Sequence, residues 1–381
     1  MKYSARFPEI WGNFGFGLLR LPMKGEDVDQ EELCKMADAF LEAGFNYFDT
    51  AHCYINGLSE TAFRDCVAKR YDRSRYLLAN KLTDIYFEKP EDIRPFFEQQ
   101  LEWCGVDYFD FYLMHGQDMT VYDKFNDCRA YEICSALKKE GLVKYFGISF
   151  HDKADVLERI LTEHPEVEFV QIQFNYVDYE DASVESRKVY EVCEKFDKPV
   201  IVMEPVKGGS LVNLPKEAED VLRSLNGGSN ASYAIRFAAG FSNMMMVLSG
   251  MSDLQQMQEN LRTMKEFTPL NTQEREAVDQ VCRIFKNLNL IPCTSCRYCI
   301  EQNSCPKQIR IPDLFAALNS LKAFKNGNAD YYYSRIITGQ GHGKASDCIR
   351  CGKCERVCPQ HLPIRDLLQE VAETFEKTGD E

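Results

Sequence analysis

The sequence predicts an α/β fold, a (β/α)8 barrel of the TIM type, followed by a small cysteine-rich domain. Short apolar runs of strand length alternate with amphipathic helical stretches, and about 260 residues of this alternation suit eight βα units. Eight of the sixteen cysteines lie close together between residues 293 and 358, which indicates a separate module. An open dinucleotide-binding sheet is disfavoured, because Gly15-Phe16-Gly17 lacks the third glycine of the usual fingerprint.

Each predicted strand is a short apolar run of the kind found in sheets that are buried on both faces. The eight runs are 15–22, 45–50, 76–82, 108–115, 143–150, 169–176, 199–206 and 244–250. The helical stretches between them include 59–71, 90–104, 152–164, 184–196 and 229–240. The alternation stops after residue 267, so we expect the barrel over residues 1–268, a connecting helix over 269–291, and the second domain over 292–381.

The composition argues against two classes of partner. The chain has 381 residues and a formal net charge of −14, whereas nucleic acids and anionic membranes bind basic surfaces. No long apolar run of membrane-spanning length is present, and no secretory signal is visible, so we expect a cytoplasmic protein. Eight scattered cysteines share no spacing and are expected to be buried free thiols: Cys34, Cys53, Cys66, Cys104, Cys128, Cys134, Cys193 and Cys282.

Four polar side chains fall where predicted strands end, and the C-terminal strand ends are where this fold places its chemistry. Asp49 and Lys81 end the second and third strands, His115 ends the fourth, and Tyr54 follows Asp49 in a tight connection. A lysine ammonium lowers the pKa of a nearby tyrosine, and a carboxylate keeps a buried lysine charged. The set can deliver a proton to a carbonyl oxygen while a hydride reaches its carbon. Taken singly, each residue also has a structural interpretation, as a helix cap, a packing residue, an exposed strand end or a core histidine.

The motifs around these residues resemble the signature of the aldo-keto reductase family over roughly residues 1–268. The matching motifs are Phe48-Asp49-Thr50-Ala51-His52-Cys53-Tyr54, Asn80-Lys81, Leu113-Met114-His115, Gly147-Ile148-Ser149, Gln171 within Val170–Asn175, and Gly250-Met251-Ser252 through Glu259-Asn260. The resemblance implies a barrel that uses NADPH or NADH to reduce a carbonyl, or to run the reverse reaction. It also implies that Tyr54 is the general acid, that Lys81 and Asp49 tune its pKa, and that His115 orients the substrate carbonyl.

The loops after the last two strands form the expected phosphate site of this fold. Lys207-Gly208-Gly209 offers a cation and two unshielded amides, and Ser252 precedes a helix whose N-terminus favours an anion. Ser252 can also cap that helix together with Gln255. By resemblance, Ser149 and Gln171 hold the nicotinamide carboxamide. The other cofactor contacts that we expect are Ser249, Gly250, Gln256, Glu259 and Asn260.

Two positions depart from the family pattern. Phe150 stands where many members have an asparagine beside the carboxamide, and neither Gly250 nor Gln256 supplies the basic residue of many NADPH-specific members. The choice between NADP(H) and NAD(H) is therefore open. The expected substrate is a small carbonyl compound or alcohol, and the candidates for lining its pocket are Trp11, Tyr86, Phe87 and Tyr122.

The cysteine-rich segment contains two related runs, Cys293-x2-Cys296-x2-Cys299-x5-Cys305-Pro306 and Cys348-x2-Cys351-x2-Cys354-x3-Cys358-Pro359. The second has the bacterial ferredoxin spacing, which predicts two [4Fe–4S] clusters. In two-cluster ferredoxins the fourth cysteine of each run ligates the other cluster. One cluster is therefore assigned to Cys293, Cys296, Cys299 and Cys358, and the other to Cys348, Cys351, Cys354 and Cys305. A pair of zinc sites with four cysteine ligands each is disfavoured because the spacing packs three thiolates tightly, and a reducing compartment disfavours disulfides.

Helical stretches at 311–324, 331–338 and 364–376 leave no room for a compact β-rich ferredoxin. The segment instead resembles the α-helical ferredoxin type, which a subgroup of aldo-keto reductases carries at the C-terminus. The clusters can deliver electrons to a partner protein, receive them, sense the redox state or simply hold the module folded. Electron transfer with a partner protein is the hypothesis that we carry forward. The alternative is a nucleotide-binding redox sensor, or an electron-transfer protein, with little carbonyl turnover.

Overall fold

The computed structural model describes residue 3 and residues 5–182, 184–225, 227–302, 305–324, 328–338 and 341–376. The chain divides into two compact units: Met1–Val206 with Ala231–Asn271, and Lys207–Asn230 with Thr272–Glu381. The connecting helix predicted for residues 269–291 falls within the second of these units from Thr272 onward. The segment after the seventh barrel strand belongs to the unit that contains the cysteine-rich segment.

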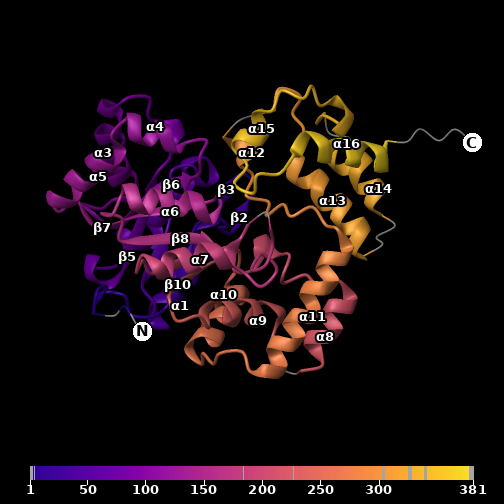
Figure 1. The fold of residues 1–381 in the computed structure, drawn as a ribbon, viewed down its shortest axis with the longest axis horizontal. Coiled ribbons are helices and arrows are strands. Elements are labelled where there is room, and N and C mark those ends of the chain that lie inside the picture. Colours follow the sequence, from indigo (N-terminus) through magenta and orange to yellow (C-terminus); the bar gives the residue numbers. More distant parts are fainter. Residues whose placement is uncertain are drawn as a thin grey trace, which may run out of the picture. The chain divides into compact units, whose positions relative to one another are not determined.

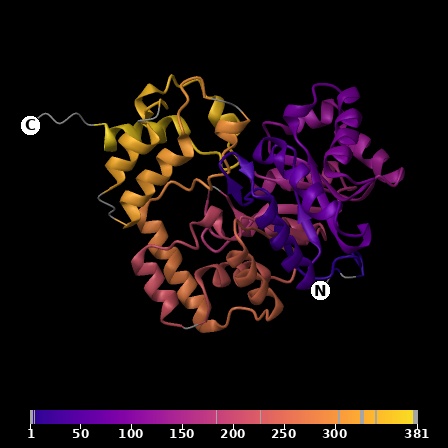
Figure 2. The same cartoon turned by 180° about the vertical axis from the view of Figure 1, so that it is seen from behind.

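The first unit is built around a closed barrel of parallel strands surrounded by helices (Figure 1; seen from behind in Figure 2). The strands are β1 (Phe14–Gly17), β4 (Tyr47–Asp49), β5 (Leu77–Leu82), β6 (Phe109–Gln117), β7 (Val143–Phe150), β8 (Phe169–Gln173), β9 (Val200–Met203) and β10 (Met244–Gly250). They follow one another around the barrel in chain order, and β1 closes it by pairing with both β4 and β10. The predicted (β/α)8 barrel is confirmed.

The helices of this unit cover the outside of the barrel. They are α1 (Gln30–Glu42), α2 (Leu58–Phe63), α3 (Pro90–Cys104), α4 (Tyr122–Asp127), α5 (Ala130–Lys139), α6 (Ala154–Glu163), α7 (Ser186–Lys195), α9 (Asn230–Ala239) and α10 (Leu254–Lys265). In α1, Asp29 accepts a hydrogen bond from the backbone N–H of Glu32 at 3.3 Å, and the buried Leu33, Met36 and Phe40 face the barrel core. A two-stranded hairpin of β2 (Met23–Lys24) and β3 (Asp27–Val28) was not predicted.

The N-terminal ends of the barrel strands are closed by large side chains. Tyr47, Phe111 and Phe169 pack in one cluster with Phe7, which comes from the segment before β1. The Phe7 ring lies 6.1 Å from that of Phe111. This end is filled mainly with apolar groups, whereas Asp49, Lys81 and His115 lie toward the C-terminal ends of their strands.

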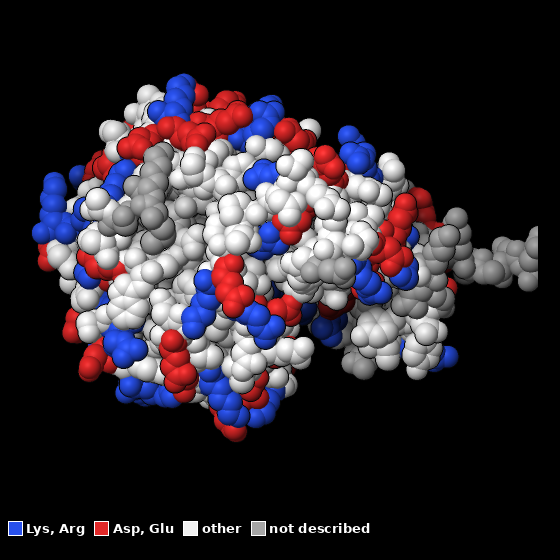
Figure 3. Space-filling view, turned by 90° about the horizontal axis from the view of Figure 1, so that it is seen from below, with Lys and Arg blue, Asp and Glu red and all other residues white. Residues whose placement is uncertain are grey.

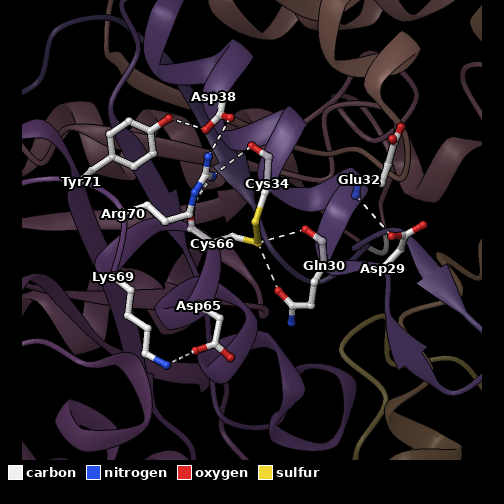
Figure 4. Close-up of a disulfide and its surroundings, with 10 residues drawn as sticks. All are labelled: Asp29, Gln30, Glu32, Cys34, Asp38, Asp65, Cys66, Lys69, Arg70 and Tyr71. Carbon is white, nitrogen blue, oxygen red and sulfur yellow. Dashed lines mark hydrogen bonds and ion pairs between the residues drawn. A yellow bond between two sulfur atoms is a disulfide. The ribbon is translucent and has the colours of Figure 1, made fainter.

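Cys34 and Cys66 form a disulfide, so the prediction that both are free thiols is wrong (Figure 4). Cys34 lies on α1 and Cys66 lies on the π-helical segment Arg64–Ala68. Their Cα atoms are 4.9 Å apart, within the range that a disulfide spans. The sequence could not show this pairing, because the two cysteines are 32 residues apart and meet only when the two helices pack.

The second unit contains the cysteine-rich segment and two further helices. Its helical elements are α8 (Lys216–Arg223), α11 (Thr272–Leu288), α12 (Tyr298–Glu301), α13 (Ile311–Phe324), α14 (Ala329–Tyr331), η6 (Tyr332–Ile337), η7 (Ala345–Asp347), α15 (Lys353–Arg356) and α16 (Ile364–Phe375). α8 and α11 lie side by side in both views. Leu314, Leu318 and Leu368 anchor an apolar core shared by α13 and α16. The predicted helices 311–324 and 364–376 are therefore present.

Charged side chains of both signs are interspersed on the face drawn in Figure 3, with no extended basic area on it. This distribution agrees with the net charge of −14. Within the described ranges, no helix combines the length and the apolar character needed to cross a membrane.

Candidate active site and cysteine module

Three of the four predicted catalytic residues meet at the C-terminal ends of neighbouring strands β4, β5 and β6. Lys81 Nζ lies 2.6 Å from Asp49 Oδ1 and donates a hydrogen bond to the backbone carbonyl of Thr50 at 2.8 Å. The side chains of Lys81 and Asp49 are 0% and 4% exposed. Such a buried ion pair keeps a charge inside the barrel only because each partner compensates the other.

Tyr54 opens a short 3-10 turn, η1 (Tyr54–Gly57), directly above this pair. Ile55 and Asn56 both have positive φ angles, 51° and 52°, so the backbone of this turn is held in a conformation that side-chain-bearing residues rarely adopt. Lys81 Nζ lies 4.8 Å from the centroid of the Tyr54 ring, and the His115 ring lies 5.9 Å from the same centroid. All four predicted catalytic residues are therefore brought together.

We call the four predicted catalytic residues, Asp49, Tyr54, Lys81 and His115, the tetrad. Their buried setting changes the pKa values of two of them. Burial raises the pKa of Asp49, and the Lys81 ammonium opposes this shift. Burial lowers the pKa of His115 well below its ordinary value, and the positive charge of Lys81 lowers it further. His115 is therefore neutral at physiological pH. Its Nδ1 lies 2.7 Å from the Thr83 hydroxyl, and if this hydroxyl donates to Nδ1, the ring proton sits on Nε2.

We expect His115 to remain neutral in the folded protein as pH falls through ~6.5, because burial lowers its pKa well below that ordinary value. The unfolded chain binds a proton at this position as pH falls through ~6.5, and the folded chain does not. The His115 contribution to stability is therefore complete above that pH and is lost as pH falls. NMR of ring-labelled histidine measures this directly. A His115 resonance that titrates near pH 6.5 contradicts the prediction.

A second buried carboxylate, Glu60, lies next to the tetrad and was not predicted. Its Oε1 accepts hydrogen bonds from Asn80 Nδ2 at 2.8 Å and Gln100 Nε2 at 3.2 Å, and its Oε2 lies 2.6 Å from His52 Nδ1. Gln100 Nε2 also donates to the backbone carbonyl of Lys81 at 3.0 Å. This network ties the helix that follows Tyr54 to the strand that carries Lys81.

Two predicted carboxamide-binding residues, Ser149 and Gln171, lie side by side on the neighbouring strands β7 and β8. Ser149 is buried and its Oγ accepts a hydrogen bond from the backbone N–H of Gly116 at 2.8 Å. Gln171 is buried as well, and its Oε1 has no hydrogen-bond partner within the described part of the chain. An acceptor without a partner costs stability unless a ligand supplies the donor, and a carboxamide N–H fits that need. The residues present therefore fit a nicotinamide group.

The start of α10 differs from the predicted capping arrangement. The N-cap is Asp253, whose carboxylate accepts from the backbone N–H of Gln256 at 2.7 Å, so the predicted Ser252–Gln255 capping box is wrong. Gln256 Nε2 also donates to Asp253 Oδ2 at 2.7 Å, and Ser252 Oγ instead donates to the carbonyl of Arg20 at 3.1 Å. The sequence pattern allowed either cap, because serine and aspartate are both strong N-cap residues.

Arg20 is a cation at this end of the barrel that sequence reasoning missed. Its side-chain carbons lie 3.2 Å from the position that a Cβ on Gly250 would occupy, and its Nη2 lies 3.6 Å from Glu204 Oε1. Among the other expected contacts, buried Asn260 donates from Nδ2 to Ser249 Oγ at 3.2 Å. Glu259 is half-buried on the same helix. These residues form one group around β1 and β10, which can bind the phosphates and adenosine of a dinucleotide.

The predicted phosphate turn, Lys207–Gly209, is part of the second unit. Gly208 has φ +62° and Gly209 has φ +94°, which favour glycine at both positions. A Cβ on Gly208 would lie 2.3 Å from the backbone oxygen of Thr294, and this contact cannot relax because it is with backbone. The turn therefore packs against the residue that follows Cys293.

The two cysteine runs adopt matching backbone conformations. Ser295 and Arg350, which precede the second cysteine of each run, have φ angles of 53° and 56°. The same match holds for Arg297 and Gly352 after the second cysteine, at 67° and 73°. Where residues with a left-handed backbone conformation alternate with right-handed ones, several backbone N–H groups point toward one side. Such an arrangement binds anionic groups, including iron–sulfur centres. The module is thus an internal repeat in structure as well as in sequence.

None of the eight predicted cluster ligands is in a disulfide, and all lie in or against the core of the second unit except half-buried Cys296 and exposed Cys351. Burial raises the pKa of Cys299, and the thiols of Cys296, Cys293, Cys358 and Cys354 raise it further, so cysteines of both runs lie near one another. Within the described ranges, no group of three or more His, Cys, Asp or Glu side chains is placed to hold a metal ion. The chemistry of the donor set fits iron–sulfur clusters, and the assignment of individual ligands stays a prediction.

The candidates for lining a substrate pocket are not all in suitable places. Trp11 lies at the opposite end of the barrel, because its backbone N–H donates to Asn46, which precedes β4. Phe87 and Tyr122 are buried in the layer between barrel and helices. Tyr86 stacks on Phe96 with ring centroids 4.8 Å apart. The prediction that Trp11 lines the substrate pocket is therefore wrong. Because Phe87 and Tyr122 are buried, they are unsuitable as pocket-lining residues as well.

Comparison with known proteins gives matches to two families. A model described as "Aldo/keto reductase family" matches residues 13–283, and one described as "4Fe-4S dicluster domain" matches residues 292–362. Among curated relatives, human "Aldo-keto reductase family 1 member C3" is 29% identical over 169 residues, which are 39% of this chain and 50% of that protein. Bovine "Dihydrodiol dehydrogenase 3" is 28% identical over 158 residues, 36% of this chain and 47% of that protein. The chain thus spans about half the length of these relatives.

Solved structures share the barrel. The holo form of an aldo-keto reductase from Bacillus halodurans has a TM-score of 0.59 and 23% identity, over 71% of this chain and 91% of that one. A Klebsiella pneumoniae aldo-keto reductase, solved in complex with NADPH, has a TM-score of 0.57 and 17% identity, over 71% and 90% of the two chains. At these identities the likeness concerns the fold.

Proposed function

The chain belongs to the aldo/keto reductase family, and we propose that it is a nicotinamide-dependent oxidoreductase that interconverts a small carbonyl compound and its alcohol. The observation that carries this proposal is the buried Lys81–Asp49 pair beneath Tyr54, with His115 beside it. A tyrosine, a buried cation and a neutral histidine are groups suited to polarising and protonating a carbonyl oxygen.

Each residue of the tetrad has a separate role in the reaction at the substrate oxygen. Bound nicotinamide supplies or accepts the hydride. Tyr54 gives its hydroxyl proton to the oxygen, and the Lys81 ammonium stabilises the tyrosinate that remains. Neutral His115 donates a hydrogen bond to the same oxygen and so fixes its direction. Asp49 keeps Lys81 charged inside the barrel.

We propose NADP(H) or NAD(H) as the cofactor, held at the carboxamide by Ser149 and Gln171. The acceptor on Gln171 supports this placement, because no described protein group donates to it. Arg20 supplies a positive charge near the expected phosphates, whereas Asp253 places a carboxylate at the N-terminus of α10. Because these charges are opposite in sign, they do not favour the binding of NADP(H) over NAD(H).

The function is tested with protein purified without oxygen and a broad panel of aldehydes and ketones. We expect oxidation of NADPH or NADH that depends on the carbonyl compound, with one alcohol formed for each cofactor consumed. Cofactor deuterated at the transferred position should give alcohol deuterated at the former carbonyl carbon. Binding of the cofactor without turnover of any compound contradicts the enzyme and favours a redox sensor.

We also propose that the second unit holds two [4Fe–4S] clusters and transfers electrons. Eight cysteines in two runs with matching left-handed turns support two equivalent sites. One site is formed by Cys293, Cys296, Cys299 and Cys358, and the other by Cys348, Cys351, Cys354 and Cys305.

Iron and acid-labile sulfide assays on the anaerobically purified protein should give about eight of each per chain. Dithionite should bleach the visible absorption and produce an electron paramagnetic resonance signal of reduced clusters. Replacing Cys296 with serine should disrupt one site, whereas replacing Cys282, which lies on α11 outside both runs, should leave the iron content unchanged. Iron far below about eight per chain, or tightly bound zinc, contradicts the two-cluster assignment.

A further inference from the structure

The two halves of the cysteine module are equivalent in backbone but differ in what covers them. Thr294 and Ile349 occupy equivalent positions, each directly after the first cysteine of its run. Thr294 is 2% exposed and lies against the Lys207–Gly209 turn, whereas Ile349 is 57% exposed. The second cysteine of each run shows the same difference in solvent exposure: Cys296 is half-buried and Cys351 is exposed. The second run therefore presents an apolar side chain and a cluster ligand to solvent.

The segment around the second run is basic in a strongly acidic chain. Residues 344–361 contain four basic side chains and two acidic ones, against a net charge of −14 for the whole protein. The four basic residues, all exposed, are Lys344, Arg350, Lys353 and Arg356. Arg350 donates to Asp366 Oδ1 at 2.6 Å, which holds its guanidinium in place and compensates part of its charge. This basic excess lies in the same stretch of the chain as exposed Ile349.

We propose that this surface, formed by Ile349 and Cys351 with the basic rim of Arg350, Lys353 and Arg356, is the docking face for a small acidic one-electron carrier protein. The proposal rests on the proposed iron–sulfur function of the module. An exposed apolar centre with a charged rim is the usual composition of a protein interface. Electron-carrier encounters use small, transient interfaces in which opposite charges speed association.

The chemistry at this face is a transfer of one electron per encounter. The carrier is oxidised by one electron while the module is reduced by one, or the reverse, and no bond forms or breaks. The exposed position of Cys351 brings a ligand of the second site to the surface, which shortens the path between the two redox centres. The equivalent approach to the first site at Thr294 is blocked by the Lys207–Gly209 turn.

Binding of a purified acidic two-[4Fe–4S] ferredoxin to the iron-loaded full-length protein tests the proposal. Calorimetry at low and high salt gives Kd without reliance on carbonyl turnover. We expect Ile349→Asp to weaken binding by about ten-fold or more, because it places a desolvated like charge at the centre of the interface. Ile336→Asp is the matched control, because Ile336 is an isoleucine on η6 that is 39% exposed, and its Kd should stay within about two-fold of wild type.

A second variant tests the rim. Lys353→Glu combined with Arg356→Glu should slow association and reduce the dependence of Kd on salt, with the iron content and cluster spectrum unchanged. No binding by iron-loaded wild-type protein, or equal Kd for Ile349→Asp and wild type, overturns the docking face while leaving the clusters in place. A wild-type protein without iron overturns the iron–sulfur function itself, and this proposal with it.

Discussion

Replacing Tyr54 with phenylalanine is expected to lower kcat/KM for every carbonyl substrate by about 10³-fold. The change removes one oxygen and leaves a ring of nearly the same shape in the η1 turn. The lost hydroxyl is the proton donor that the tetrad places beside Lys81, so the reaction loses its general acid. A loss of this size corresponds to about 4 kcal/mol of transition-state stabilisation.

Cofactor affinity separates this effect from a folding defect. Tyr54→Phe should bind the nicotinamide cofactor with a Kd close to that of wild type, because the proposed carboxamide contacts are Ser149 and Gln171. Tyr71→Phe is the matched control, since the Tyr71 hydroxyl bonds to Asp38 on the outside of the barrel (Figure 4). It should retain wild-type kcat/KM. A Tyr54→Phe enzyme that turns over carbonyl compounds at the wild-type rate would remove the tyrosine from the mechanism.

The barrel and the tetrad could be predicted because both follow from local patterns. Apolar runs of strand length repeat through the first 250 residues, and the C-terminal ends of adjacent strands must lie side by side in a closed parallel barrel. Asp49, Lys81 and His115 lie at the ends of three consecutive strands of that barrel, so their proximity follows from topology alone. The cysteine runs were recognisable for a similar reason, because cluster ligation requires fixed spacing.

Features that depend on packing between distant segments could not be predicted from the sequence. The Cys34–Cys66 disulfide needs α1 to lie against the Arg64–Ala68 turn, and neither segment indicates this partner. Glu60 looked like an ordinary residue in a helix start, although its carboxylate is completely buried. Arg20 reaches Gly250 from 230 positions away in the sequence. The Lys207–Gly209 turn was assigned to the barrel, whereas Gly208 lies against the backbone of Thr294 in the cysteine-rich segment.

The buried ion pair gives the largest expected effect on stability. Lys81→Met leaves Asp49 without its partner at a position that is only 4% exposed. We expect this variant to lose about 3–5 kcal/mol of unfolding free energy, because a buried charge without compensation is strongly destabilising. Its kcat/KM should also fall by about 10²-fold or more, since the tyrosinate loses its cation.

A double substitution distinguishes the two roles of the pair. Lys81→Met combined with Asp49→Asn removes both charges and keeps similar volumes, so most of the stability should return. Activity should not return, because the missing ammonium is needed at Tyr54. Lys195→Met is the control, since the Lys195–Glu158 pair is on the surface and should be worth less than about 0.5 kcal/mol. Urea unfolding of the cofactor-free proteins and carbonyl turnover give the two readouts. Recovery of both stability and activity in the double variant would show that Lys81 serves only the fold, and recovery of stability alone assigns it to the chemistry of the tyrosine.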